Sequence, residues 1–146
     1  LAGEINSEMP NKVVKELSMT LRGRFNKNLD RAYILVMGIA YKKNIDDTRE
    51  SPGLMIIKLL EQQGAKVDYF DPYVFIIPET REHKSLSGRR SVSWDAEKFA
   101  NYDAVLICTD HDEVDYEELI DNCRLLIDTR NVTGRMSLSS EKIQKI

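Results

Sequence analysis

A short run of branched apolar residues constrains the fold of this chain more than any other feature. The run Ile34–Met37 ends at Gly38 and has the composition of a strand buried on both faces, as strands of parallel sheets are. A polar loop follows. Ser51-Pro52 then predicts the start of a helix, with serine as the N-cap and proline at the first helical position. The sequence therefore predicts a strand, a loop and a helix of an α/β fold.

The same alternation of strand and helix patterns continues along the chain. We predict strands over Ala32–Met37, Lys66–Phe70, Val92–Trp94, Ala104–Cys108 and Leu125–Asp128, helices over Met9–Leu21, Pro52–Gln63, Asp95–Ala100, Tyr116–Asn122 and Glu141–Ile146, and a polar surface loop over Val74–Ser91. Strands that alternate with helices favour right-handed crossovers and a Rossmann-like, doubly wound parallel sheet. Residues 1–30 are predicted to form a helical segment with a polar linker, and residues 31–146 the α/β domain.

Composition and charge narrow the class of partner. A chain of 146 residues can form one domain with a buried core, and its net charge of -3 argues against nucleic acid or an anionic membrane as the main partner. No apolar run approaches the roughly 20 residues of a membrane-spanning helix. Cys108 and Cys123 lie in apolar segments and are predicted to be reduced core residues of a cytoplasmic protein. The start at Leu1 suggests a fragment or a processed chain.

Polar residues follow four of the predicted strands. If the strands are parallel, their carboxyl ends share one edge of the sheet, which is where ligands bind in open α/β folds. The residues expected at this edge are Tyr41 and Lys42, then Asp71, then Thr109, Asp110 and His111, and finally Asp128, Thr129 and Arg130. A glycine-rich G-x-G-x-x-G loop is missing, because only Gly38 of that pattern is present. This domain is therefore not expected to hold NAD by the usual route.

Lys42 is the strongest candidate for a ligand-binding residue. A loop lysine is usually just solvated, but Lys42 lies at the predicted crevice beside Tyr41, whose ring could pack on a base or a sugar. Arg130 is a second candidate, because a guanidinium can bind phosphate or carboxylate with two hydrogen bonds. An ion pair between Arg130 and Asp128 is an equally good interpretation from the residues alone. These candidates predict an anionic ligand held by side-chain charge.

The other polar residues are interpreted as structural. Arg49 lies among acids, immediately before Glu50 and the helix N-cap Ser51, and is predicted to shape the loop through ion pairs. No second histidine or cysteine lies near His111 at metal-ligand spacing, so a polar loop is favoured over a catalytic or metal role. Cys108 has no apparent base partner and is interpreted as a core residue. The basic stretch 81–90 is interpreted as solvated, with contact to the ligand or a neighbouring domain as the alternative.

Five sequence blocks together resemble one enzyme family. They are Gly38-x-x-Tyr41-Lys42, Asp46-Asp47-x-Arg49-Glu50-Ser51-Pro52, Asp71-Pro72-Tyr73, Thr109-Asp110-His111 and Asp128-Thr129-Arg130-Asn131. In this order, and over nearly the whole chain, they resemble the C-terminal domain of the nucleotide-sugar 6-dehydrogenases, which act on UDP-glucose, UDP-N-acetylhexosamines or GDP-mannose. The segment from Glu4 to Pro10 is similar to the end of the family's central helical segment, through which these enzymes dimerise.

The resemblance implies the UDP-sugar-binding domain of an NAD-dependent enzyme that oxidises the sugar C6 alcohol to a carboxylate, as in polysaccharide biosynthesis. By this resemblance Tyr41 and Lys42 match the pair that contacts the nucleotide sugar, and Arg130 matches an arginine that helps to hold it. NAD and the catalytic cysteine belong to an N-terminal domain, so this fragment is expected to bind no cofactor and to be inactive. The long loop Val74–Ser91 is more similar to the UDP-N-acetylhexosamine branch. The expected partners are the UDP-sugar, the N-terminal domain and a second copy in a homodimer.

A noncatalytic regulatory or dimerisation module is the alternative. A receiver-like domain needs an acidic pair after its first strand to bind magnesium, and Gly38-Ile39-Ala40 occupies that position. A dimerisation module is harder to exclude, because the Met9–Leu21 helix has an apolar face without an assigned partner. Specific binding of UDP favours the enzyme domain, whereas oligomerisation without any ligand favours the module.

Overall fold

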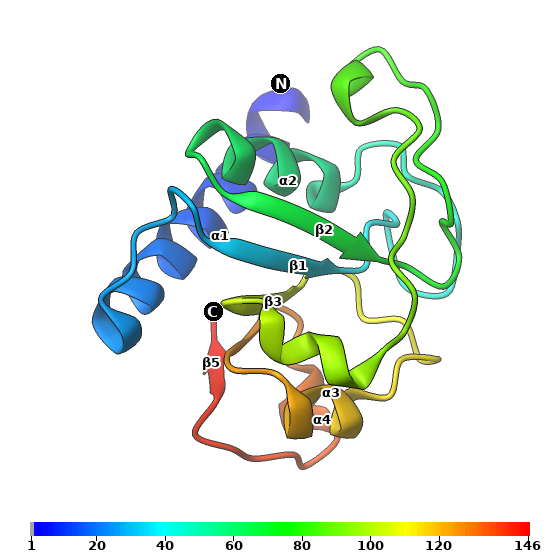
Figure 1. Ribbon diagram of the computed structural model, residues 1–146. Coiled ribbons are helices and arrows are strands. Elements are labelled where there is room, and N and C mark those ends of the chain that lie inside the picture. Colours follow the sequence, from blue (N-terminus) through cyan, green and yellow to red (C-terminus); the bar gives the residue numbers. More distant parts are fainter. Residues whose placement is uncertain (1) are drawn as a thin grey trace.

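A five-stranded parallel sheet forms the centre of the protein in the computed structural model, which describes residues 2–146 and the side chains of residues 8–146 (Figure 1). The strands are β1 (Tyr33–Met37), β2 (Lys66–Phe70), β3 (Ala104–Ile107), β4 (Leu126–Asp128) and β5 (Ile143–Lys145). Their spatial order is β2-β1-β3-β4-β5, and every neighbouring pair is parallel. The chain therefore leaves β1 toward one side for β2 and returns to the other side for β3, which is the doubly wound arrangement that the sequence predicts.

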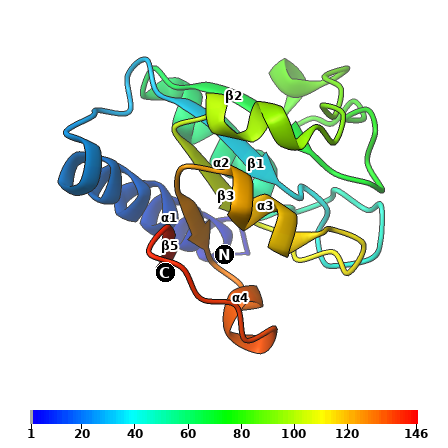
Figure 2. The same ribbon diagram turned by 60° about the horizontal axis from the view of Figure 1, so that its bottom comes forward.

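Helices cover both faces of this sheet (Figures 1 and 2). The helices α1 (Ala2–Phe25) and α2 (Pro52–Gln62) pack together on one face, and the 3-10 helix η2 (Ala96–Asn101) and α3 (Tyr116–Asn122) cover the other. Successive strand residues point to opposite faces, so Ile34 and Val36 join the core under α1 and α2, while Leu35 and Met37 join the other core. All four side chains are fully buried, which explains the unbroken apolar run in the sequence.

The start of α2 is fixed against the end of β1. The hydroxyl of the N-cap Ser51 accepts a hydrogen bond from Gly53 N at 3.1 Å and donates one to the carbonyl oxygen of Ile39 at 2.6 Å. At the other end of the helix, Gly64 has a φ of +92°, the left-handed conformation expected just after a helix. Both ends of α2 thus agree with the sequence prediction, and the loop between β1 and α2 is held close to the edge of the sheet.

The first helix is longer than predicted. It runs to Phe25, so Gly23, which was expected beyond its end, lies inside it. Asn26 follows the helix with a φ of 51°. Asparagine adopts the left-handed conformation at little cost, so it serves where the sequence reading expected glycine. The buried face of α1 consists of Val13, Val14, Leu17 and Leu21, which pack in the core shared with α2.

The C-terminal segment is a strand, and the prediction of a helix over Glu141–Ile146 is wrong. Ile143 lies opposite Leu126 of β4 in a parallel pair. Two hydrogen bonds flank the pair, from Leu126 N to Lys142 O at 2.9 Å and from Ile146 N to Asp128 O at 3.1 Å. The spacing of Ile143 and Ile146 suits a helix face, but so short a helix is marginal by itself, and the free edge of β4 offers backbone partners instead.

Two further elements differ from the prediction on the side of η2. Val92–Trp94 is not a strand, although Val92 N donates a hydrogen bond to Tyr69 O at 2.8 Å. The predicted helix Asp95–Ala100 is the 3-10 helix η2, with the carboxylate of Asp95 accepting a hydrogen bond from Glu97 N. The segment lies at the β2 edge, where a single backbone contact replaces the ladder of a full strand.

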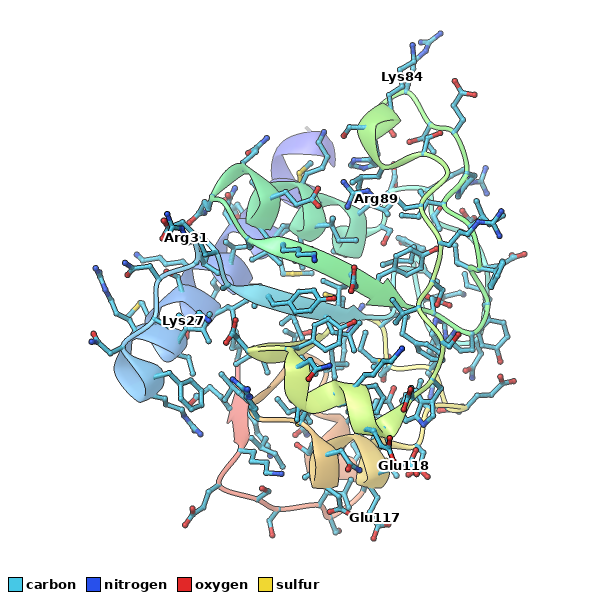
Figure 3. All side chains as sticks on the ribbon, viewed as in Figure 1. Lys27, Arg31, Lys84, Arg89, Glu117 and Glu118 are labelled. Carbon is cyan, nitrogen blue, oxygen red and sulfur yellow. The ribbon has the colours of Figure 1, made fainter. Side chains whose placement is uncertain are left out.

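The long loop 74–91 is a loop, as predicted, but it is partly buried. It holds a 3-10 turn, η1 (Lys84–Leu86), and one antiparallel bridge between Ile76 and Arg90. Ile77 and Leu86 are buried in the core, so the loop is anchored even though its sequence shows no apolar period. Figure 3 shows Lys84 at the outer tip of the loop and Arg89 near α2, where it pairs with Glu61 at 2.7 Å. None of the helices in the described part of the chain is long and apolar enough to cross a membrane.

Candidate functional site

Asp71 joins the loop after β1 to the turn after β2. One of its oxygens, Oδ2, accepts hydrogen bonds from Ile39 N at 2.8 Å and Ala40 N at 3.2 Å. The other, Oδ1, accepts from Tyr73 N at 2.8 Å and Val74 N at 3.1 Å. The carboxylate is buried, and four backbone donors satisfy it. It therefore fixes the chain at the end of two neighbouring strands.

His111 brings the loop after β3 into the same network. Its side chain is fully buried, with Nε2 at 2.9 Å from Asp71 Oδ2 and Nδ1 accepting a hydrogen bond from Asn44 N at 2.8 Å. A backbone N–H can only donate, so Nδ1 carries no proton and Nε2–H donates to Asp71. Burial raises the pKa of Asp71, but the hydrogen bonds from His111 and from backbone N–H groups outweigh it and lower this pKa. The sequence reading of His111 as part of a polar loop missed this buried contact.

The loop that carries Tyr41 and Lys42 is anchored at its ends and exposed between them. Tyr41 N donates a hydrogen bond to Asp47 O at 2.6 Å. Asn44 and Asp112 exchange two hydrogen bonds, from Asn44 Nδ2 to Asp112 Oδ2 at 2.7 Å and from Asp112 N to Asn44 Oδ1 at 3.0 Å. Tyr41 is 48% exposed, and Lys42 is exposed with no hydrogen bond or ion pair among the side chains described for residues 8–146. Both side chains are thus available to a ligand.

Arg130 follows β4 and lies across the end of β3. Its Nε donates a hydrogen bond to the carbonyl oxygen of Cys108 at 3.0 Å. Within the described residues its guanidinium forms no ion pair with Asp128, so the structural interpretation of Arg130 finds no support. The contact through Nε orients the guanidinium and leaves its two terminal nitrogens without a partner in the described part of the chain. Arg130 is therefore a cation that is held in one orientation and whose terminal nitrogens are available to a ligand.

Asp128 instead caps the short helix α4 (Val132–Arg135). Its carboxylate accepts hydrogen bonds from Arg130 N at 3.0 Å, Val132 N at 3.2 Å and Thr133 N at 2.9 Å. The Thr133 hydroxyl donates a further bond at 2.6 Å. Burial raises the pKa of Asp128, but these bonds outweigh burial and lower it, so the side chain is a carboxylate at neutral pH. Asp71 and Asp128 have the same role at two points of the edge.

Cavities lie on both sides of the exposed loop. One cavity of about 610 Å³ is lined by Tyr41, Asp47, Thr48, Arg49, Glu50, Thr80, Arg81, Glu82 and His83. A second, of about 480 Å³, is lined by Asp128, Thr129, Arg130, Asn131, Lys145 and Ile146. A third, of about 170 Å³, shares Thr129, Arg130 and Ile146 and adds Met9, Lys12 and Val13 of α1. Tyr41 and Arg130 thus line different cavities at the same edge, with the end of β3 between them.

The residues predicted to shape the loop lie beside the first cavity. Arg49 Nη2 lies 2.8 Å from Asp47 Oδ2, and the Arg49 side chain is 85% exposed. The hydrogen bonds from Arg49 lower the pKa of Asp47 to about 2. Glu50 has a φ of 56°, and Ser51 follows as the N-cap of α2. Arg49 thus forms its ion pair within the loop, with Asp47.

The opposite wall of the first cavity comes from the 74–91 loop. In the sequence this loop is marked only by its basic composition. His83 is buried, and its Nδ1 has no hydrogen-bond partner in the described part of the chain. Burial, together with the charge of Lys58, lowers the pKa of His83, so the ring is neutral. Arg81 and Thr80 lie next to it in the cavity wall. This wall gains its position from the buried Ile77 and Leu86, which no sequence period revealed.

The two cysteines are not placed for nucleophilic chemistry. Both are buried and free. Burial raises the pKa of the Cys108 thiol to about 12 and that of Cys123 to about 11, so both are thiols at neutral pH. Across the described residues, no group of three or more His, Cys, Asp or Glu side chains is arranged to hold a metal ion. The arrangement can bind an anion at the sheet edge, but it presents no reactive thiolate.

Comparison with known proteins gives a consistent picture. The model of the UDP-glucose/GDP-mannose dehydrogenase family, UDP binding domain, matches residues 35–135. The chain is 30% identical to a UDP-N-acetyl-D-mannosamine dehydrogenase of Methanococcus maripaludis over 142 residues, which is 90% of this chain and 29% of the relative. It is 37% identical to the UDP-glucose 6-dehydrogenase TuaD of Bacillus subtilis over 114 residues, 76% of this chain and 23% of the relative. A solved UDP-D-ManNAc dehydrogenase of Pyrococcus horikoshii matches 98% of this chain and 32% of its own with a TM-score of 0.70 and 26% identity. The chain therefore spans about a third or less of the length of these proteins.

Proposed function

Because the chain belongs to the UDP-glucose/GDP-mannose dehydrogenase family, as its UDP-binding domain, we propose that it is the substrate-binding C-terminal part of an NAD-dependent UDP-sugar 6-dehydrogenase. The substrate is a UDP-N-acetylhexosamine or UDP-glucose, and the product is the corresponding uronic acid. The names of the relatives, which include both kinds of dehydrogenase, support this substrate class. The enzyme supplies uronic acids for polysaccharide synthesis in the cytoplasm.

The proposal rests on two cations at the carboxyl edge that have no acidic partner. Lys42 and Arg130 are exposed and have no acidic partner among the side chains of residues 8–146, although the chain as a whole is acidic. They follow β1 and β4, which β3 separates, so the strands that carry them are roughly 10 Å apart. A nucleoside diphosphate can bridge this distance, with its phosphates near the cations and its base or sugar near Tyr41. Charge-assisted hydrogen bonds to phosphate are among the stronger polar contacts in proteins.

The buried carboxylates of the edge do not oppose an anionic ligand. Asp71 and Asp128 are ionised, but backbone N–H groups surround both of them. Their charge is balanced locally by these dipoles, and burial keeps them away from the surface. These two carboxylates therefore do not compete with a diphosphate for Lys42 and Arg130.

The oxidation step belongs to another part of the enzyme in this proposal. The sequence has no G-x-G-x-x-G loop for NAD, and both thiols are protonated and buried. Neither a cofactor nor a covalent nucleophile is therefore assigned to this chain. NAD and the catalytic cysteine are assigned to an N-terminal domain, which is the first protein partner, and a second copy of the enzyme in a homodimer is the other.

The competing proposal of a dimerisation module loses its main argument. It rested on an apolar face of the first helix without an assigned partner. That face, represented by Leu17 and Leu21, is fully buried against α2 and the sheet inside the domain. Among the described side chains of α1, from residue 8 onward, the exposed apolar ones are scattered, such as Met19 and Phe25, and such residues are common on monomeric proteins.

Calorimetric titration with UDP tests the proposed function. We expect saturable binding of UDP and none of NAD by this chain. Lys42→Ala should weaken UDP binding by about 10- to 100-fold, because a hydrogen bond to a charged group contributes about 1.5–3 kcal/mol. Lys43→Ala is the matched control, since the neighbouring Lys43 already pairs with Asp112 at 3.5 Å. Binding of NAD without UDP, or equal losses in the two variants, would contradict the proposal.

A further inference from the structure

His111 joins three segments that are far apart in the sequence. Its Nε2 donates to Asp71 after β2, its Nδ1 accepts from Asn44 N in the loop after β1, and its own backbone follows β3. The loop from Tyr41 to Asn44 is the one to which the proposed function assigns the substrate contacts. We propose that His111 is a positioning residue for UDP-sugar binding, which holds this loop in place through the acceptor at Nδ1. The inference rests on the proposed function and adds the group that controls the site.

The ring of His111 is itself immobilised. Its side chain is fully buried, and the ring of Tyr73 packs against it with a centroid distance of 4.8 Å. The hydroxyl of Tyr116 donates to the carbonyl oxygen of His111 at 2.9 Å, which fixes the backbone. Asp71 holds Nε2 at 2.9 Å. These contacts fix the direction in which Nδ1 presents its lone pair to the loop.

Asn44 is the residue through which the loop is held. Its backbone N–H bonds to His111, and its side chain exchanges two bonds with Asp112, the next residue along. Asn44 has a φ of 65°, a conformation that asparagine tolerates better than most residues. Lys42 is only two residues earlier, so its ammonium depends on where Asn44 is fixed. If the bond from Asn44 N to His111 is lost, Asn44 is held only by its side-chain bonds to Asp112. The ammonium group of Lys42 then occupies a wider range of positions.

Two substitutions separate the two contacts. In His111→Asn the short amide places its oxygen near the former Nδ1, so the bond from Asn44 N is kept and the donor to Asp71 is lost. In His111→Gln the longer amide reaches toward Asp71, and the acceptor for Asn44 is lost. A residue that merely fills the core would make the two variants equally harmful to ligand binding. A positioning residue predicts that His111→Asn binds UDP better than His111→Gln does.

Amide hydrogen exchange and UDP titrations of the wild-type chain and of the two variants test the inference. We expect the Asn44 amide to lose protection in His111→Gln and to keep it in His111→Asn, because only asparagine retains an acceptor for Asn44 N. UDP affinity should fall about fivefold in His111→Gln, as for the loss of one ordinary hydrogen bond, and by less in His111→Asn.

The outcomes for this inference and for the proposed function can be told apart. If wild-type protein binds UDP and His111→Gln binds it equally well, the positioning role is overturned while the proposed function stands. Unchanged protection of the Asn44 amide in His111→Gln, which requires no ligand, would also overturn it. If the two variants show the expected exchange behaviour but the wild-type chain binds no UDP, the contact of His111 with the loop is correct and the proposed function fails.

Discussion

Replacement of Asp71 by asparagine should destabilise the protein markedly, although it removes only one charge from the edge. The amide has one acceptor and one donor end where the carboxylate has two acceptors. In the less costly orientation its oxygen keeps the bonds from Ile39 N, Ala40 N and His111 Nε2, and its NH₂ group faces Tyr73 N and Val74 N. Each buried donor left without an acceptor costs about 1–3 kcal/mol. Because Tyr73 is only partly buried, we expect a loss of about 2–4 kcal/mol in the free energy of unfolding.

Urea denaturation followed by tryptophan fluorescence measures this loss. The single tryptophan, Trp94, is a suitable probe because its ring packs against Phe70 and Phe99 at centroid distances of 5.1 and 4.8 Å. Asp112→Asn is the matched control, since the Asp112 side chain is 64% exposed, and it should cost less than about 1 kcal/mol. Equal midpoints for wild-type protein and Asp71→Asn at pH 7 would refute the reasoning that the carboxylate satisfies four buried donors.

The effect should also depend on pH in a defined direction. The pKa of Asp71 is lower in the folded protein than the ordinary value of about 3.9 for an aspartate in an unfolded chain. The stability that this carboxylate contributes is therefore complete above pH 4 and is lost as the pH falls through the folded pKa. Asp71→Asn cannot titrate, so the difference in stability between the two proteins should shrink below about pH 4. A difference that grows in acid would show the opposite sign.

Two further substitutions test the site and the fold. Arg130→Lys should bind UDP about tenfold more weakly than wild-type protein. Lysine keeps the charge but has neither the Nε contact to Cys108 O nor the paired terminal donors. Calorimetry measures this loss of affinity, and unchanged affinity would remove Arg130 from the site. Gly38→Ala should prevent stable folding or lower Tm by more than about 5 °C, because Gly38 has a φ of +86° and an added Cβ would lie 2.4 Å from Thr109 O. Thermal unfolding measures this change in Tm. Gly88→Ala is the control, because Gly88 has a φ of +84° but no atom lies within 4 Å of an added Cβ.

The fold could be predicted from the sequence wherever local pattern and tertiary packing agree. β2 and α3 have their predicted bounds, and α2 differs from its prediction by one residue. In these elements the apolar positions, the caps and the flanking turns all favour the same structure. The prediction fails at β5, where Ile143 and Ile146 fit a helix pattern but the free edge of β4 decides the outcome. Pairing with a distant strand leaves little trace in a segment of three residues.

The candidate site could be predicted only up to the level of its edge. Parallel strands place Tyr41, Lys42 and Arg130 at one edge whatever the loops do, so that expectation follows from fold class alone. Sequence does not give the order of the strands, and this order decides that His111 meets both Asp71 and Asn44. A histidine between two aspartates therefore resembled an ordinary polar loop. Its burial depends on contacts that are about 40 and 67 residues away in the chain.

The division between buried carboxylates and exposed cations explains how an acidic domain can hold an anion. An ion pair between Asp128 and Arg130 would occupy the donors of the guanidinium and weaken its binding to a ligand. Instead, Asp128 takes its hydrogen bonds from backbone N–H groups, and Arg130 is oriented by a neutral carbonyl oxygen. Asp71 acts in the same way for the loop of Lys42. Asp71 and Asp128, which are satisfied by the backbone, fix the loops without pairing with Lys42 or Arg130, so these two cations remain available to a diphosphate.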